Sequence, residues 1–128
     1  MNKKIVNTED APKAIGPYSQ AVVAGGFLFS AGQVGLDPVS MKLVDGGIEP
    51  QTEQLISNLK AVLAAEKLDF SHVVRTSIYL KDISDFQTVN QIYEKHFAGS
   101  RPARSTIQVA ALPLNALIEM DLVAHIPG

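Results

Sequence analysis

The chain has 128 residues, of which 46% are hydrophobic and 19% charged, with a formal net charge of −2. This is the composition of a globular protein and excludes a disordered chain. The acidic balance argues against a nucleic-acid binder that neutralises phosphates, and the absence of cysteine excludes disulfide and thiolate chemistry. No apolar run reaches membrane-spanning length, and from the N-terminal residues we expect no signal peptide. We therefore expect a cytoplasmic protein with one domain over residues 1–128.

Hydrophobic periodicity predicts an alternation of strands and helices. Gly25-Gly26 lies between two short apolar runs and indicates a hairpin, because paired glycines accept the positive φ of a tight turn. Pro50 suits the first turn of one helix, Asp85 can cap another, and Gly99 ends it. In chain order, we expect a strand over 3–6, a loop over 10–17, hairpin strands over 19–24 and 27–31, a loop over 32–47, a helix over 50–67, a strand over 73–80, a helix over 85–99, a strand over 104–110, a break at 112–113 and a strand over 118–126.

This order of elements predicts an α+β fold with a mixed sheet and both helices packed on one face. The helix-covered face takes the apolar side chains of the alternating last strand. A mixed polar and apolar face is rarely left bare, so we expect the opposite face to pack against copies of the chain in a symmetric oligomer. The polar residues expected on that opposite face are Arg75, Ser77, Tyr79, Arg104, Thr106, Gln108 and Glu119.

Arg104 is the first candidate for chemistry. A guanidinium held on a rigid strand offers a planar fork of donors that grips a small carboxylate with two hydrogen bonds. Its small neighbours, Ala103 and Ser105, leave room for a ligand. The alternative is an arginine in an ordinary salt bridge at the surface or at an interface.

Glu119 is the second candidate, because it interrupts a strongly apolar strand. A carboxylate in that place can orient water or relay a proton. The alternative is a solvated strand edge, or an ion pair with an arginine such as Arg104 or Arg75.

Three further residues could line a pocket. Tyr18 follows a Gly-Pro corner and either covers a pocket with its ring or serves only as a structural corner. Gly32 lies in a turn whose backbone N–H groups either hold an anion or simply form a turn. Asn90 lies within a helix, where asparagine has poor propensity, so it either caps a group or reaches toward a site. The histidines lack the spacing of metal ligands, so we expect no metal site; they are His72, His96 and His125.

An ordered series of short motifs runs from Ala11-Pro12 to Ala124. Each motif alone is weak, but the ordered set is highly specific. On this set the chain resembles the RidA family, also called YjgF or the UK-type translation-inhibitor family. The motifs are Ala14-Ile15-Gly16-Pro17-Tyr18-Ser19-Gln20, Ala31-Gly32-Gln33, Asn58-Leu59-Lys60, Asp82-Ile83-Ser84-Asp85-Phe86, Val89-Asn90, Tyr93, Pro102-Ala103-Arg104, Val109-Ala110-Ala111-Leu112-Pro113 and Ile118-Glu119.

The resemblance implies a chorismate-mutase-like fold and a homotrimer with sites between subunits. It implies hydrolysis of enamine and imine acids of the 2-aminoacrylate and 2-aminocrotonate type to 2-oxo acids and ammonia, without cofactor or metal. Such intermediates are released by pyridoxal-phosphate-dependent dehydratases. By this resemblance Arg104 clamps the substrate carboxylate and Glu119 positions water. The substrate-binding positions that it implies are Tyr18, Ala31, Gly32, Asn90 and Thr106.

Two departures from the family pattern bear on the substrate range. Many members have Ser or Thr where this chain has Ala31, and many have Cys where it has Thr106. Three other functions stay open beside the deaminase. They are a non-catalytic module that binds 2-oxo acids or a protein, a ribonuclease or translation inhibitor, against which the acidic balance counts, and a chorismate-mutase-type enzyme.

Overall fold

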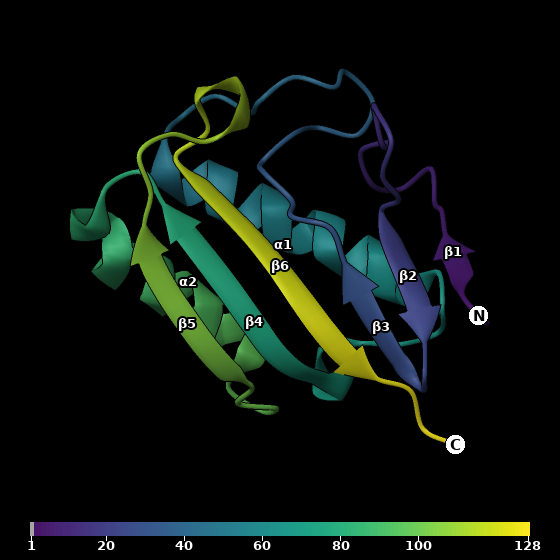
Figure 1. The fold of residues 1–128 in the computed structure, drawn as a ribbon. Coiled ribbons are helices and arrows are strands. Elements are labelled where there is room, and N and C mark those ends of the chain that lie inside the picture. Colours follow the sequence, from purple (N-terminus) through teal and green to yellow (C-terminus); the bar gives the residue numbers. More distant parts are fainter. Residues whose placement is uncertain (1) are drawn as a thin grey trace.

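The computed structural model describes residues 2–128 as one six-stranded sheet with two α-helices (Figure 1). The strand order across the sheet is β1-β2-β3-β6-β4-β5, and within the described residues β4 and β5 are the only parallel neighbours. The predicted mixed α+β fold is confirmed. The elements are β1 (Lys4–Val6), β2 (Ala21–Ala24), β3 (Phe27–Ser30), α1 (Ile48–Ala64), η1 (Phe70–His72), β4 (Val73–Leu80), η2 (Ile83–Asp85), α2 (Phe86–Phe97), β5 (Ala103–Gln108), η3 (Pro113–Asn115) and β6 (Ile118–His125).

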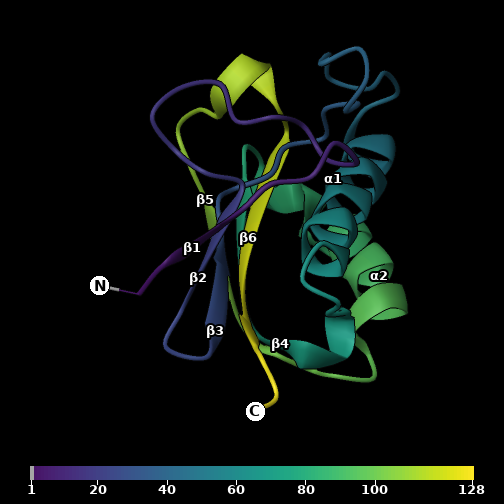
Figure 2. The same ribbon diagram turned by 90° about the vertical axis from the view of Figure 1, so that its right-hand side faces the viewer.

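Both helices cover the same face of the sheet, as predicted (Figure 2). The core lies between these two layers. Leu55, Leu59 and Leu63 recur along one side of α1 and are fully buried, because this spacing keeps them on the face that meets the sheet. No helix in residues 2–128 has the length and apolar character that crossing a membrane requires. The other face of the sheet, called here the open face, carries no helix from the part of the chain that the structure describes.

Strand β6 separates the two faces cleanly. Its side chains alternate between buried positions and half-buried ones, which is the period of two expected for a strand covered on one side. Ile118 and Met120 are 0% exposed and point toward the helices, whereas Glu119 and Asp121 point to the open face. The alternation predicted for the last strand is confirmed.

The prediction of which face of the sheet the polar side chains of edge strand β5 occupy was wrong. Arg104 lies beside Thr76 and Thr106 beside Ile78, and both of these β4 residues are buried on the helix side. Arg104, Thr106 and Gln108 therefore belong to the helix-covered side of the sheet, not to the open face. An edge strand exposes both of its sides near the rim, so its polar residues do not reveal which face they occupy.

Some boundaries also differ from the prediction. Helix α1 ends at Ala64 rather than near Lys67, whose φ of 61° is incompatible with continuing the helix. Asp85 does occupy the position before α2, but its side chain makes no capping hydrogen bond. The capping carboxylate in this region is that of Asp82, which accepts a hydrogen bond from the Ser84 backbone N–H and starts η2.

Candidate functional site

Arg104 is held in a fixed orientation by residues of α2. Its Nη1 donates a hydrogen bond to the Asn90 side-chain oxygen at 2.7 Å. The guanidinium carbon lies 4.7 Å from the ring centre of Tyr93 and 5.5 Å from that of Phe86, so two aromatic faces flank the charge. These contacts immobilise the fork and leave N–H donors for a planar acid. We call Arg104, Asn90, Tyr93 and Phe86 the Arg104 cluster.

Tyr93 is itself held in place by a hydrogen bond to strand β4. Its hydroxyl lies 2.8 Å from the hydroxyl of Thr76, in a buried hydrogen bond between α2 and β4. Burial raises the pKa of the Tyr93 hydroxyl, so it stays neutral beside the guanidinium. A cavity of about 390 Å³ opens beside the cluster, lined by Asn90, Tyr93 and Arg104 and, at its rim, by Arg101 and Glu94.

Thr106 follows on the same side of β5. Its hydroxyl is buried and makes no hydrogen bond within residues 2–128. A buried hydroxyl without a partner is uncommon and costs free energy. The hydroxyl is therefore a group that a ligand or a neighbouring chain could satisfy.

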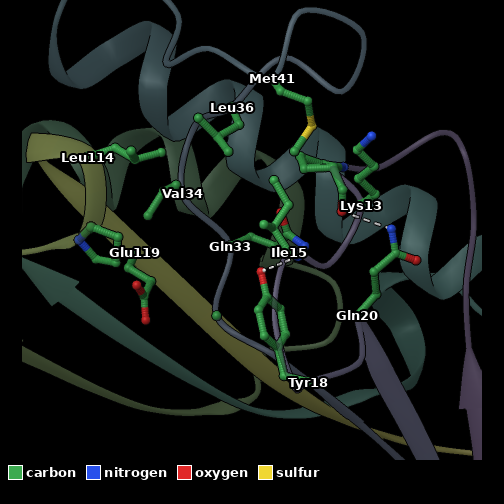
Figure 3. Close-up of a pocket in the computed structure, with 13 residues that line it drawn as sticks. Lys13, Ile15, Tyr18, Gln20, Gln33, Val34, Leu36, Met41, Leu114 and Glu119 are labelled. Atoms are coloured by element: carbon green, nitrogen blue, oxygen red, sulfur yellow. Dashed lines mark hydrogen bonds between the residues drawn. The ribbon is translucent and has the colours of Figure 1, made fainter.

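Glu119 faces a second cavity, of about 320 Å³, on the open side of the sheet. Tyr18 and Gly32 line this cavity together with Glu119, and apolar side chains such as Leu36 and Leu114 line the rest. Figure 3 shows Glu119 on one side, Lys13 and Gln20 on the other, and the Tyr18 ring between them. We call this the Glu119 cavity.

The Glu119 carboxyl group makes no hydrogen bond or ion pair with any other residue of the range 2–128. Burial raises its pKa, and the negative charge of Asp121 raises it further. Asp121 is itself an acceptor, because the Tyr79 hydroxyl donates a hydrogen bond to it at 3.0 Å. A half-buried acid with a raised pKa and free oxygen atoms is suited to proton transfer at a site.

Gln20 fixes the loop that forms the far wall of the Glu119 cavity. Its side chain is 2% exposed, and its nitrogen donates to the backbone oxygens of Thr8 and Pro12 at 3.0 and 2.9 Å. Its oxygen accepts from the Thr8 N–H at 2.7 Å. A buried carboxamide with these partners keeps the loop in place, and Tyr18 follows on that same loop.

The sequence-predicted residues thus fall into two groups. Tyr18, Gly32 and Glu119 line one cavity, while Asn90 and Arg104 line the other. Ala31 flanks the first group, but its N–H donates to the backbone carbonyl oxygen of Gln20 at 2.9 Å and is no longer a free donor. Within one chain, Arg104 and Glu119 are on opposite sides of the sheet.

Sequence reasoning missed the aromatic support of Arg104. Phe86, Asn90 and Tyr93 recur at helical spacing on one face of α2, and that spacing is the signal that could have connected them. It also missed Gln20, whose role depends on loop contacts that no periodicity indicates. Across residues 2–128, no group of three or more His, Asp or Glu side chains is placed to hold a metal ion.

Comparison with known proteins identifies the family. The family model described as endoribonuclease L-PSP matches residues 8–126. The chain is 51% identical over 124 residues to reactive intermediate deaminase A of Arabidopsis thaliana, covering 97% of this chain and 66% of that protein. The chain belongs to the RidA family. A human relative, 2-iminobutanoate/2-iminopropanoate deaminase, is 45% identical, and the match covers 95% of this chain and 89% of that protein.

Solved RidA-family structures share the fold. The structure of RidA from an Antarctic Psychrobacter has a TM-score of 0.92 and 36% identity, covering 96% of this chain and 99% of that one. The structure of Escherichia coli TdcF with bound serine has a TM-score of 0.90 and 31% identity, covering 97% and 99%. The names of the relatives support imine deamination at the level of the family.

Proposed function

We propose that this chain hydrolyses enamine and imine acids of the 2-aminoacrylate and 2-aminocrotonate type to 2-oxo acids and ammonia, as a 2-iminobutanoate/2-iminopropanoate deaminase. The observation that carries the proposal is the immobilised Arg104 fork, with N–H donors to spare, in a chain that also holds Glu119, an acid with a raised pKa and no partner among the described residues. The deaminase names of relatives that are 45% and 51% identical support it.

Arg104 binds the substrate. The carboxylate of the imine acid accepts hydrogen bonds from the guanidinium N–H groups that Asn90 does not use. Such charge-assisted contacts contribute about 1.5–3 kcal/mol. Because Phe86 and Tyr93 hold the guanidinium plane, the carboxylate and the adjoining C=N carbon take one orientation.

Glu119 acts on water. Its carboxylate takes a proton from a water molecule as the oxygen attacks the C=N carbon, and it passes this proton on to the imine nitrogen. The resulting aminoalcohol loses ammonia, so one imine acid and one water give one 2-oxo acid and one ammonia. A positioned acid or base contributes about 10²–10⁴-fold to the rate. The C=N carbon already reacts with plain water, so we propose that the reaction needs neither metal nor cofactor.

We further propose that the working site lies between two copies of the chain in a homotrimer. Arg104 of one copy and Glu119 of the next would then face one substrate, which the two cannot do within one chain. The open face offers apolar surface for this contact, because Phe29, Val74 and Ile107 are 43%, 43% and 50% exposed. Burying such side chains against a symmetric copy is favourable.

We expect the protein to carry out this reaction in the cytoplasm. The test is pyruvate release from 2-aminoacrylate generated in situ by a serine or cysteine dehydratase. Native protein should accelerate release, and Arg104→Ala should abolish the acceleration while fold and oligomer persist. Lys60→Ala, at an exposed residue of α1, removes a positive charge elsewhere and should leave the rate unchanged. Near-native activity of Arg104→Ala would refute the carboxylate clamp.

A second candidate function is suggested by the name of the family model, endoribonuclease L-PSP. The histidines on which a ribonuclease could rely lie apart: His72 at η1 contacts Asp69, and His96 on α2 contacts Glu53. RNA cleavage that is lost together with imine hydrolysis in Arg104→Ala would support one shared site. Cleavage that survives this substitution would place ribonuclease activity outside it.

A further inference from the structure

Gly32 occupies a tightly fixed place beside β6. The residues on both sides of it are anchored: Ala31 donates its N–H to the backbone carbonyl oxygen of Gln20 at 2.9 Å, and Gln33 exchanges two backbone hydrogen bonds with Met120, at 2.8 and 3.0 Å. These bonds have the ordinary length of backbone hydrogen bonds. The backbone at Gly32 therefore has little freedom to move away from β6.

The Glu119 carboxyl group rests directly against this glycine. A Cβ atom added to Gly32 would lie 2.3 Å from Glu119 Oε2, 2.7 Å from Cδ and 3.1 Å from Cγ. The first two separations are shorter than real Cβ contacts, and the third is tight, so any side chain at position 32 must displace the carboxyl group. Since the backbone is anchored, Glu119 is the partner that would move.

The glycine is not required by its backbone conformation. Five other glycines have a positive φ, but Gly32 does not, so an alanine could adopt the same backbone angles. The space taken by the carboxyl group is thus the feature that excludes a side chain at this position.

We propose that Gly32 is the positioning residue for Glu119. The space left by its missing side chain, called here the seat, holds the carboxyl group. This inference rests on the proposed function and deepens it. The seat substitutes for hydrogen bonds, because the carboxyl group makes none within residues 2–128 and is placed by packing instead. The seat also keeps the acid half-buried, in keeping with the upward shift of its pKa.

Gly32→Ala tests the seat. The added methyl group pushes the carboxyl group toward solvent, so kcat should fall by about 10²-fold. KM should change little, because Arg104 binds the substrate carboxylate on a different element. The acid limb of the kcat/KM profile should move to lower pH, because the acid becomes better solvated. Gly99→Ala, where an added Cβ meets nothing within 4 Å, is the matched control and should behave as native protein.

A second substitution distinguishes a lost seat from general damage. Glu119→Asp shortens the acid by one methylene, which withdraws it from a methyl group at position 32. We expect Glu119→Asp alone to lose about 10-fold, and the double variant Gly32→Ala, Glu119→Asp to be at least as active as Gly32→Ala. If the two losses multiply, or if Gly32→Ala retains native activity, the seat is refuted.

A measurement without turnover separates this inference from the proposed function. The carboxyl carbon of Glu119 can be titrated by NMR in the Arg104→Ala background, with Gly32 and with Gly32→Ala, so that no guanidinium of a neighbouring copy pairs with the acid. A lower pKa in the variant supports the seat even if no imine acid proves to be a substrate. An unchanged pKa in a folded variant overturns it, even if native protein is an active deaminase.

Discussion

Arg104 and Glu119 lie on opposite faces of one sheet. Arg104 is on the edge strand β5 beside buried Thr76, on the helix side, and Glu119 is on β6 beside Tyr79, on the open side. Strand β4 separates the two strands. A sheet is a solid layer of backbone, so one small substrate cannot contact both side chains within a single chain. A site that uses both needs a second copy, and this relationship leads to the first prediction.

Mixing two inactive variants should restore activity. Arg104→Ala keeps Glu119, and Glu119→Gln keeps Arg104, so a mixed oligomer contains interfaces with both intact groups. In a ring assembled at random from equal amounts, about a quarter of the sites are intact. We expect about a quarter of native pyruvate release after co-refolding the two variants, against almost none for either alone.

The control for this complementation is a mixture made without refolding, in which chains do not exchange. It should stay inactive. If the co-refolded mixture is also inactive, although mixed oligomers are present by native mass spectrometry, the two groups do not share a site between copies.

Asn90→Asp should weaken substrate binding. The Asn90 oxygen already accepts a hydrogen bond from Arg104 at 2.7 Å, so a carboxylate in its place forms an ion pair with the guanidinium. This ion pair competes with the substrate carboxylate, and we expect KM to rise about 10-fold or more while kcat changes less. Steady-state kinetics check this, with Gln87→Glu, at an exposed residue of the same helix, as the charge-matched control. A KM equal to the native one would contradict the clamp.

The sequence was sufficient for the fold because long periodic segments dominate it. The apolar spacing of α1 and the strict alternation of β6 each report a buried face, and the structure confirms both. The assignment of Arg104 to a face failed for a related reason. On edge strand β5 every side chain is at least partly exposed, so polarity carries no information about which face a residue occupies.

The site was harder to predict because its parts meet through tertiary contacts. Arg104 and Asn90 were both proposed from the sequence, but their direct hydrogen bond depends on how α2 crosses β5. The contact of Gly32 with Glu119 joins residues far apart in the chain, and a glycine in a turn does not reveal which side chain occupies its empty space. Such contacts follow from register between strands, which local patterns determine poorly.

Thr106→Val should separate stability from binding. The Thr106 hydroxyl is buried without a partner among residues 2–128, and an unsatisfied group of this kind costs about 1–3 kcal/mol. Valine has nearly the same shape, so the free energy of unfolding should rise or stay level. If the hydroxyl binds the substrate, KM should rise at the same time. Thermal unfolding and kinetics of the same preparation test both, with Thr106→Ser as the variant that keeps the hydroxyl. A loss of stability would mean that the hydroxyl has a partner, such as a neighbouring chain.

Glu119→Gln should stabilise the protein at neutral pH while abolishing turnover. The pKa of Glu119 is raised in the folded protein, by burial and by the charge of Asp121. A raised folded pKa means that the contribution of this acid to stability is full below its unfolded pKa, near 4.5, and is lost as the pH rises through the folded value.

Glutamine at position 119 carries no charge to desolvate, so the variant should have the higher Tm near pH 8, and the difference should close toward about pH 4. The comparison is made in the Arg104→Ala background at one protein concentration, so that a guanidinium from a neighbouring copy cannot pair with Glu119. Glu9→Gln, at an exposed acid, controls for the loss of one negative charge. A Tm difference that is absent at pH 8, or that grows as the pH falls, would show that the Glu119 carboxylate is well solvated or paired, and would remove the electrostatic basis for its role as the base.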